Sequence, residues 1–392
     1  MRICYLADGR YIHARRWIRY FSQHGHEMNL VSFAPMTPEH IHAIEESGGH
    51  YLGELGGFHF KRFWLTGGEL LSLRRLLRRE KIDILHCHFL GSNAWYAALS
   101  GFRPLVITVM GGGDVRGPDW RPTGTRERLL TPFALHRADL VTSWSLVMAK
   151  AVRPFCRDET PVEVIHGGVA LNRFHRGPKP EYLRERWNLP VDAKVIFSPR
   201  LMRPLSNITQ IARAAGMIRE KVPNTYFLFA APAEERNETY EAEVRRLLRE
   251  AGAENNARFI GAIPHDEMAD YHRFADVTVS IPSTDGTPMT VLESMACGTP
   301  VVVGNIPDYD PYYFQQGETV LTADPADAES VAQAIIKLLT DVSVAHSLSM
   351  EAERRVSASG SYESQMSRMN KLYSDLFQSR RASENGDRAA QQ

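Results

Sequence analysis

Residues 285–303 read DGTPMTVLESMACGTPVVV, a loop that turns into a helix and leads to an apolar strand. Gly286 and Pro288 predict a bend, and the Gly-Thr-Pro further along ends the helix. The free N–H groups at such a helix start suit a phosphate. Asp285 and Glu293, on either side of the bend, suit sugar hydroxyls because an ionised carboxylate only accepts hydrogen bonds. The stretch therefore predicts a pocket for a ligand that carries both phosphate and sugar.

Short apolar strands alternate with amphipathic helices on both sides of this stretch, along nearly the whole chain. This rhythm is typical of parallel sheets with helices on both faces. It occurs twice, which predicts an α/β fold of two doubly wound, Rossmann-like domains. The predicted strands are 2–6, 28–33, 82–86, 105–109, 140–143, 162–166, 194–198, 226–230, 257–260, 277–281 and 300–303. The predicted helices are 14–24, 69–80, 94–99, 208–221, 238–250, 266–274, 291–296 and 328–339.

A length of 392 residues is too great for one typical core, so we expect two domains. We place the first at 1–170 and the second at 171–360, with a linker rich in Pro, Gly and charge near 171–189. Residues 361–378 are predicted to form a last amphipathic helix that packs back on the first domain. The polar tail 379–392 is predicted to be disordered. Ligands bind at the carboxyl ends of strands in such sheets, so hinge motion would enclose a ligand in a cleft that both domains face.

The bulk composition excludes several classes of protein. A hydrophobic content of 43% and a charged content of 23% are ordinary for a globular protein. No apolar run approaches the length of a membrane span, and the first residues lack the apolar core of a signal peptide. The four cysteines are far apart and form no CxxC, which favours a reducing, cytoplasmic location.

The net charge is zero, and no basic stripe indicates a nucleic-acid partner. Residues 1–170 nevertheless carry a small excess of Lys and Arg. This excess either is ordinary surface variation or favours an anionic acceptor or a weak peripheral contact with the inner face of a membrane.

The loop after the first predicted strand carries Gly9, Arg10 and His13. Its backbone N–H groups, with Arg10 or Arg15, would suit a phosphate near the amino end of the next helix. A solvated turn before an amphipathic helix explains the same residues equally well.

Two later loops of the first domain carry further candidates. His86-Cys-His88 has the spacing of paired metal ligands, but no third ligand type stands nearby. We therefore favour His88 as a histidine that lines the ligand site over a metal site. After the strand 105–109, three glycines would let the backbone approach a ligand closely, although a flexible turn is equally consistent. The candidates in that loop are Gly111, Gly112 and Asp114.

Two loops of the second domain also follow predicted strands. Arg200 and Arg203 come after the strand 194–198, and an arginine at a strand end would neutralise a pyrophosphate. An interdomain salt bridge is the alternative for these arginines. Gly261 and Ile263 follow the strand 257–260, where exposed backbone would pair with the edge of a nucleobase.

Taken in this order, the segments resemble the family-4 retaining glycosyltransferases of GT-B fold over nearly the whole chain. The clearest part is the E-x7-E signature of that family, with Asp285 and Glu293 in its two acidic positions. Residues 164–174 (VIHGGVALNRF) resemble the interdomain segment VIPNGVDxxRF. Residues 259–283 resemble the F-x-G…AD…PS stretch, and residues 12–27 resemble the first-helix pattern.

The resemblance implies a role for each matching residue. Asp285 would face the donor sugar, Glu293 would hold the ribose hydroxyls, and Arg200 would bind the diphosphate. The resemblance further implies that no metal or other cofactor is obligatory. The remaining donor contacts would come from the loop and helix start, namely Gly286, Thr287, Pro288, Met289 and Thr290.

The chain departs from the family pattern in three places. Asp285 replaces the usual glutamate and is one methylene shorter. Leu205 stands where the family has a lysine, with Arg203 as its possible replacement in the phosphate clamp. Met110-Gly111 replaces the family's His-Gly, which leaves His88 as the nearby candidate for a catalytic histidine beside Asp285.

The sequence thus leads to the hypothesis of a metal-independent retaining hexosyltransferase with a nucleotide-sugar donor, a UDP-sugar by analogy with the family. Its acceptor would be a carbohydrate, a lipid-linked molecule or a small molecule in glycan, glycolipid or cell-surface polysaccharide synthesis. One alternative is another GT-B reaction, such as nucleotide-sugar epimerisation or phosphorolysis. The other is a non-catalytic module that binds sugar nucleotides, which the missing lysine and histidine would explain.

Overall fold

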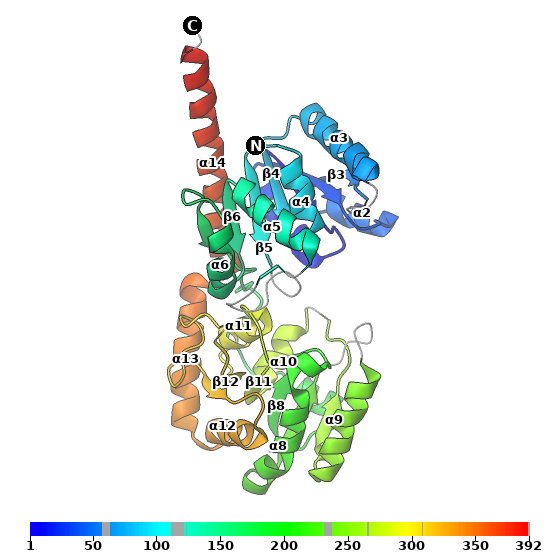
Figure 1. Ribbon diagram of the computed structural model, residues 1–392. Helices are drawn as coiled ribbons and strands as arrows, with labels where there is room; N and C mark the ends of the chain where they lie inside the picture. The colour runs from blue at the N-terminus through cyan, green and yellow to red at the C-terminus, as the bar shows by residue number, and fades with distance from the viewer. Residues whose placement is uncertain are drawn as a thin grey trace. The chain divides into compact units, whose positions relative to one another are not determined.

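The computed structural model describes residues 1–56, 63–110, 121–122, 124–230, 237–264, 266–307 and 309–390. The chain forms two compact units, each built around one parallel sheet (Figure 1). Unit 1 comprises Met1–Gly167 and Ser364–Gln392, and unit 2 comprises Gly168–Glu363. The predicted α/β, two-domain GT-B architecture is confirmed by these sheets and by the structural neighbours described below.

Within the described residues, the sheet of unit 1 has seven strands in the order β3-β2-β1-β4-β5-β6-β7, and every pair is parallel. Helices α3 to α6 pack on one face, and α1 and α14 pack on the other. The strands are β1 Arg2–Ala7, β2 Glu27–Ser32, β3 Gly49–Glu54, β4 Ile84–His88, β5 Leu105–Val109, β6 Leu140–Ser143 and β7 Val162–Val164. The helices are α1 Ile12–Gln23, α2 Pro38–Glu45, α3 Phe63–Arg79, α4 Ser92–Leu99, α5 Thr125–Arg137, α6 Leu146–Val152 and α14 Tyr362–Ala390.

The described part of unit 2 has a parallel sheet of six strands in the order β10-β9-β8-β11-β12-β13. Helices α8, α9 and α12 cover one face, and α7, α10, α11 and α13 cover the other. The strands are β8 Lys194–Ser198, β9 Thr225–Phe229, β10 Ala257–Phe259, β11 Val277–Ser280, β12 Val301–Gly304 and β13 Leu321–Ala323. The helices are α7 Tyr182–Arg186, α8 Ile208–Lys221, α9 Glu238–Glu250, α10 Met268–Phe274, α11 Met289–Ala296, α12 Ala328–Thr340 and α13 Val342–Ser359.

The hydrophobic pattern explains why these elements form and where they pack. Helix α8 buries Ile208, Ile211, Ala215 and Ile218, which share one helical face. Full burial of each isoleucine contributes about 1.5–3 kcal/mol. The strands, in contrast, are apolar on both faces, as expected for a parallel sheet covered on both sides.

Each sheet has one point at which the strand order reverses. In unit 1 this point lies between β1 and β4, and in unit 2 it lies between β8 and β11. The connections after these two strands run to opposite faces, and ligands of doubly wound sheets generally bind at the carboxyl ends of such strands. In unit 2, the loops that border this point contain Arg200 and Asp285.

The chain passes between the units at two segments that lie side by side within unit 2. The N–H of Val169 donates to the Gly360 carbonyl at 2.8 Å, and the N–H of Tyr362 donates to the Val169 carbonyl at 2.7 Å. Gly168 has a φ of +67°, and a Cβ added there would lie 2.4 Å from Tyr362 Cα. Only glycine fits this position, because it tolerates the backbone conformation and leaves room for the second segment.

Two segments of the chain differ from what the sequence predicts. The stretch 171–189, expected to be a linker, lies inside unit 2, where Leu183 and Leu189 join a buried core cluster. The tail, expected to be disordered from residue 379, continues α14 to Ala390. A helix that has already formed adds one hydrogen bond per residue, and Arg, Ala and Glu in the tail have good helix propensity.

Buried hydrogen bonds attach α14 to the sheet of unit 1. Tyr373 Oη lies 2.5 Å from His86 Nδ1 and 3.2 Å from Tyr5 Oη. His86 Nε2 lies 2.6 Å from Thr108 Oγ1, which lies 2.6 Å from Thr142 Oγ1. Burial lowers the pKa of His86 well below its usual range, so the imidazole is neutral and can both donate and accept in this chain.

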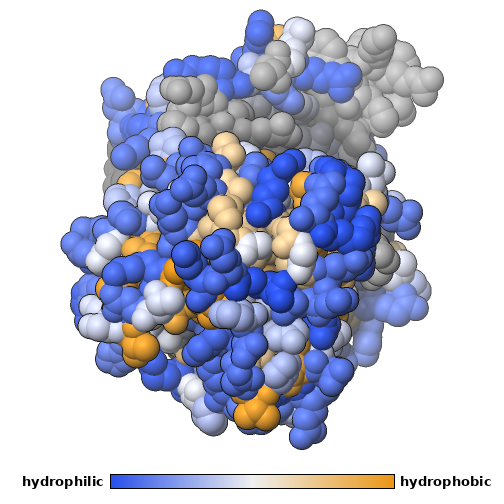
Figure 2. Space-filling model, turned by 90° about the horizontal axis from the view of Figure 1, so that it is seen from below, coloured by the Kyte–Doolittle hydropathy of each residue, from blue (hydrophilic) through white to orange (hydrophobic). Residues whose placement is uncertain are grey.

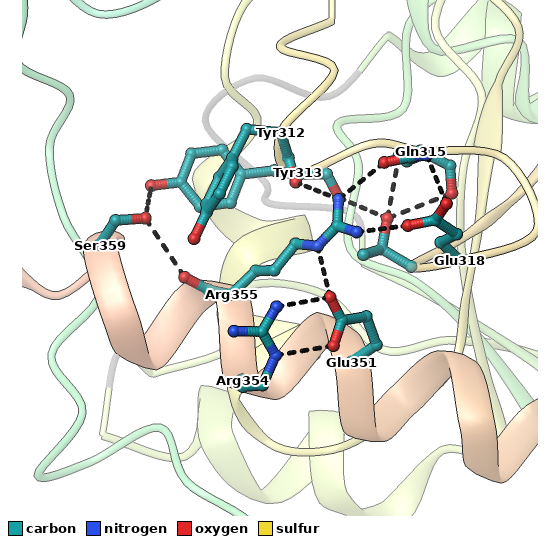
Figure 3. Close-up of polar contacts among 9 residues, drawn as sticks. Tyr312, Tyr313, Gln315, Glu318, Glu351, Arg354, Arg355 and Ser359 are labelled. Atoms are coloured by element: carbon teal, nitrogen blue, oxygen red, sulfur yellow. Dashed lines mark hydrogen bonds and ion pairs between the residues drawn. The ribbon is translucent and has the colours of Figure 1, made fainter.

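Arg355 attaches α13 to the loop that precedes β13 (Figure 3). Its Nη1 donates to the Tyr312 carbonyl at 2.8 Å and to Gln315 Oε1 at 3.0 Å. Its Nη2 donates to Glu318 Oε2 at 2.5 Å, and its Nε donates to Glu351 Oε1 at 2.7 Å. The guanidinium is buried, so these partners compensate a charge that water does not reach.

Figure 2 shows hydrophilic side chains over most of the face that it presents, with apolar side chains in small, separate groups. The exposed large apolar side chains include Val191 and Val342 in unit 2. Among the described residues, no single helix has the length and apolar character of a membrane span.

His272 of α10 is a buried histidine of the unit 2 core. Its ring packs edge-on at 5.5 Å from the ring of Phe197 and at 6.2 Å from that of Phe174. Neither ring nitrogen has a hydrogen-bond partner. Burial, and secondarily the charge of Arg273, lowers the pKa of His272 to about 3.

We expect His272→Phe to reduce the loss of stability on acidification. In the unfolded chain, His272 has its ordinary pKa of 6.5, whereas its pKa in the folded protein is about 3. Between these two pH values the unfolded chain binds more protons than the folded protein. The free energy of unfolding therefore decreases as the pH falls through this range. At pH 5, protonation of His272 in the unfolded chain lowers the free energy of unfolding by about 2 kcal/mol. Urea denaturation at pH 7 and pH 5 should show that the free energy of unfolding falls by about 2 kcal/mol more in the wild type than in the variant. Equal losses would contradict the assignment.

Candidate functional site in unit 2

Hydrogen bonds join the two loops at the switch point of unit 2. The N–H of Ser283 donates to the Leu205 carbonyl at 3.0 Å. Asn207 Nδ2 donates to the Ile281 carbonyl at 3.0 Å and to Ser283 Oγ at 2.9 Å. Asn207 has a φ of +51°, a left-handed conformation that asparagine tolerates better than most residues. These bonds fix the loop after β8 against the loop after β11.

Arg200 and Asp285 form an ion pair on these joined loops. Arg200 Nη1 lies 2.8 Å from Asp285 Oδ2, and the two side chains are only 15% and 19% exposed. Asp285 Oδ1 accepts a hydrogen bond from the N–H of Gly286 at 2.8 Å. Oδ2 is buried without an aligned hydrogen bond, despite its closeness to the guanidinium. A buried carboxylate oxygen in this state can accept a hydrogen bond from a ligand hydroxyl.

Helix α11 carries the second carboxylate. It starts after Pro288, which has extended backbone and no side-chain cap, and its first turn contains no acidic residue. Thr287, Met289 and Thr290 are partly buried at this start. The first N–H groups of a helix have no acceptor within it, so this start can bind an anion. Glu293 lies one turn further along the helix and is nearly buried.

The structure places the other predicted donor residues at the same edge of the sheet. Arg203 is exposed in the loop after β8, as is Leu205, which stands where the family has a lysine. Gly261 and Ile263 follow β10, two strands away from β8. Gly261 has a φ of +71° with open space around the position of a Cβ. Arg200 and Asp285 contact each other. Among the described residues, no hydrogen bond or ion pair joins Arg203, Leu205, Gly261 or Ile263 to that pair.

Several polar groups at this edge were not predicted from the sequence. Ser198 ends β8 and Ser280 ends β11, and both hydroxyls are buried without a hydrogen-bond partner among the described residues. Asn207 and Ser283, which join the two loops, were also not identified. A hydroxyl residue at the last position of an apolar strand is the one sequence signal that would have identified the two strand ends.

In unit 1, Gly9 and Arg10 have local partners. A Cβ added at Gly9 would lie 2.6 Å from Leu30 Cδ2 and 2.7 Å from Met36 Cε, so a side chain there would displace the ends of these two side chains. Arg10 donates from Nε to Asp8 Oδ1 at 2.9 Å and from Nη2 to Asp8 Oδ2 at 2.7 Å. Asp8 therefore compensates the charge that the sequence suggested for a phosphate.

His88 is buried at the carboxyl end of β4. Its ring centroid lies 4.6 Å from that of Tyr5 and 5.2 Å from that of Trp17. Burial, and secondarily the nearby His13, lowers its pKa to about 3, so it is neutral near pH 7. Its Nε2 has no hydrogen-bond partner within the part of the chain that the structure describes.

His13 and the next residue after His88 lie at the same switch point. The His13 ring packs edge-on against Trp144, with 4.7 Å between the centroids. Phe89 has a φ of +68°, an unusual conformation for an aromatic residue and one that often marks functional sites. Gly111, Gly112 and Asp114 lie outside the described residues. Within the described residues, no group of three or more potential ligands could hold a metal ion.

Two family models match the chain. The model described as "Glycosyltransferase Family 4" matches residues 9–173, and the model described as "Glycosyl transferases group 1" matches residues 181–355. Together with the two parallel sheets, these matches define a glycosyltransferase of GT-B fold. Within this class, the chain belongs to the family-4 glycosyltransferases.

Individual relatives are distant. D-inositol 3-phosphate glycosyltransferase 2 of Catenulispora acidiphila is 28% identical over 57% of this chain and 55% of its own length. The chain thus spans about half of that relative. N-acetyl-alpha-D-glucosaminyl L-malate synthase of Bacillus anthracis is 21% identical over 78% of each chain. The crystal structure of Anabaena Alr3699/HepE in complex with UDP and glucose shares the fold, with a TM-score of 0.74 and 17% identity over 96% of this chain and 100% of that one.

Proposed function

We propose that the protein transfers a hexose from a nucleotide sugar, most simply a UDP-sugar, to an acceptor with retention of anomeric configuration. The observation that carries the proposal is the buried Asp285 Oδ2 beside Arg200 at the switch point of unit 2. It offers a hydrogen-bond acceptor for a sugar next to a cation for a phosphate. The solved structure of similar fold that contains UDP and glucose supports this choice of donor.

In the proposed reaction, the bond between the anomeric carbon and the diphosphate oxygen breaks as an acceptor oxygen bonds to that carbon. The acceptor's proton leaves with the nucleoside diphosphate. Arg200 and the start of α11 would stabilise the negative charge that develops on the leaving diphosphate. Asp285 would hold a donor-sugar hydroxyl, and Glu293 would hold the ribose hydroxyls.

The ion pair implies that donor binding changes the partners of Arg200. A diphosphate would attract the guanidinium, and the sugar hydroxyl would supply the hydrogen bond that Asp285 Oδ2 lacks. Arg203, exposed in the same loop, is the proposed substitute for the lysine that the family has at the position of Leu205. With cationic side chains and helix N–H groups at the diphosphate, we propose that the reaction needs no metal ion.

We further propose that the acceptor binds unit 1 and carries negative charge. Two relatives are named for inositol 3-phosphate and L-malate, and both of these molecules are anions. The excess of basic residues in 1–170 is consistent with this choice. A phosphorylated lipid at a membrane surface would have the same charge and remains the alternative acceptor.

Donor hydrolysis tests the proposal without knowledge of the acceptor. With an α-linked donor such as UDP-glucose, proton NMR at early times should show α-glucose as the first product, at the same rate with and without EDTA. Release of β-glucose would contradict retention. A rate that EDTA abolishes and Mn²⁺ restores would contradict metal independence, and a requirement for orthophosphate would indicate a phosphorylase instead.

A further inference from the structure

A cavity of about 330 Å³ opens at the amino-terminal edge of the unit 2 sheet. Lys194 begins β8, Asp276 precedes β11 and Pro300 precedes β12, and all three line the cavity. Arg200 and Asp285 follow the carboxyl ends of β8 and β11, at the opposite edge of the sheet. The cavity is therefore separate from the proposed donor site.

The cavity has more positive than negative charge at its rim. Lys179 Nζ lies 2.8 Å from Asp276 Oδ1, and Lys194 Nζ lies 3.6 Å from the same oxygen. Asp276 Oδ2 accepts a hydrogen bond from the N–H of Val195 at 2.8 Å, which holds this carboxylate at the start of the sheet. Two ammonium groups thus share one carboxylate. Both lysine side chains are partly exposed, so either can turn toward an anion.

Two arginines also line the cavity. Arg176 Nε donates to Glu353 Oε2 at 2.8 Å, and its guanidinium lies directly on Gly298. A Cβ added at Gly298 would lie 2.5 Å from Arg176 Cζ, so the absence of a side chain makes room for the arginine. Arg273 Nη2 donates to Asp270 Oδ1 at 2.6 Å. Both arginines have carboxylate partners, so the surplus charge belongs to the two lysines.

Apolar residues, together with His346 and Ser349, line the cavity where α12 meets α13 at an angle of 96°. Leu338, Leu339, Val342 and Ala345 line it. Val342 is 77% exposed, although it is a large apolar residue at the mouth of a cavity. Burial raises the pKa of the Cys297 thiol to about 12, so this part of the lining is also uncharged near pH 7.

We propose that this cavity binds a small organic anion, whose phosphate or carboxylate contacts Lys179 and Lys194 while its apolar part packs against Leu338 and Val342. The volume is within the range of small-molecule sites and fits a molecule about the size of one substituted ring. Such a site combines a few polar groups that fix orientation with an apolar wall that contributes affinity. The inference does not depend on the proposed transfer reaction.

Calorimetric titration of the full-length chain with phenyl phosphate, inorganic phosphate and phenol tests the site. Phenyl phosphate has both required features and should bind about tenfold more tightly than either partial probe. The double variant Lys179→Gln/Lys194→Gln should lose about tenfold or more in affinity. Lys371→Gln, which changes an exposed lysine on α14 of unit 1, should bind as the wild type does.

Val342→Asp provides a second variant if the lysine variant fails to fold, because Val342 is exposed and a polar residue there is compatible with folding. It should weaken phenyl phosphate binding by placing a like charge beside the anion. UDP should not displace phenyl phosphate. The proposal is overturned if phenyl phosphate does not bind, if UDP displaces it, or if binding is the same in the wild type and the cavity variants.

Discussion

Arg200→Ala is expected to lower kcat/KM for sugar transfer by about 100- to 1000-fold, the effect of removing one preorganised electrostatic group. The guanidinium is mostly buried and lies 2.8 Å from Asp285, so it is held in place before any ligand arrives. Its loss removes the cation from the diphosphate and also leaves the Asp285 carboxylate without its ion-pair partner. Arg200→Lys should recover only part of the activity, because an ammonium lacks the planar fork of the guanidinium.

Two variants in the same loop serve as comparisons. Arg203→Ala should lower the rate by about tenfold if Arg203 replaces the missing lysine, since an exposed charge contributes less than a buried one. Leu205→Lys restores the family's lysine at an exposed position and should not disturb folding. Initial rates with saturating and limiting donor would separate kcat from KM. An Arg200→Ala variant with more than half of the wild-type activity would exclude the proposed role.

Arg355→Leu is expected to destabilise unit 2 by about 3 kcal/mol, at the lower end of the range for breaking a buried ion pair. The lower end applies because Glu318 is half exposed and water can reach it once the arginine is gone. The variant would also remove the donor from the Tyr312 carbonyl and from Gln315, both of which Arg355 contacts in Figure 3.

Arg354→Ala is the matched control for this prediction. Arg354 contacts the same Glu351 carboxylate, but its side chain is 65% exposed. Exposed ion pairs contribute about 0–1 kcal/mol, so this variant should unfold almost as the wild type does. Urea denaturation would measure the loss of stability of each variant. Hydrogen exchange of the backbone amides in α13 would show whether that loss lies in unit 2. Equal stability of the two variants would mean that Arg355 has no special structural role.

Much of the fold follows from the periodicity of the sequence. Strands β5, β6 and β8 and helices α8 and α9 have the predicted bounds, because each has a strong apolar pattern between clear breakers. Strand β3 was not predicted, since GHYLGE is an edge strand with two glycines and little apolar character. Helix α13 was not predicted either, because it begins with Val and Ser, which have modest helix propensity.

The candidate site was predictable in its parts but not in its internal contacts. The family motif located Asp285 and Glu293, and the strand pattern located Arg200 at a sheet edge. The ion pair between Arg200 and Asp285 depends on the neighbouring positions of β8 and β11, which the chain order does not reveal. The burial of His88 likewise depends on α1, whose Trp17 covers the end of β4.

The central claim is that Asp285 holds the donor sugar while the rest of the site holds the nucleotide. Calorimetric titration of the wild type and of Asp285→Ala with UDP measures the binding of the nucleotide alone. Titration with UDP-glucose, GDP-glucose and ADP-glucose then measures what the sugar adds to that binding. We predict that one nucleotide sugar binds the wild type, that Asp285→Ala weakens its binding by about tenfold or more, and that the free nucleotide binds both proteins alike. The absence of binding by every nucleotide and nucleotide sugar, or equal affinity of both proteins for the sugar donor, would contradict the claim.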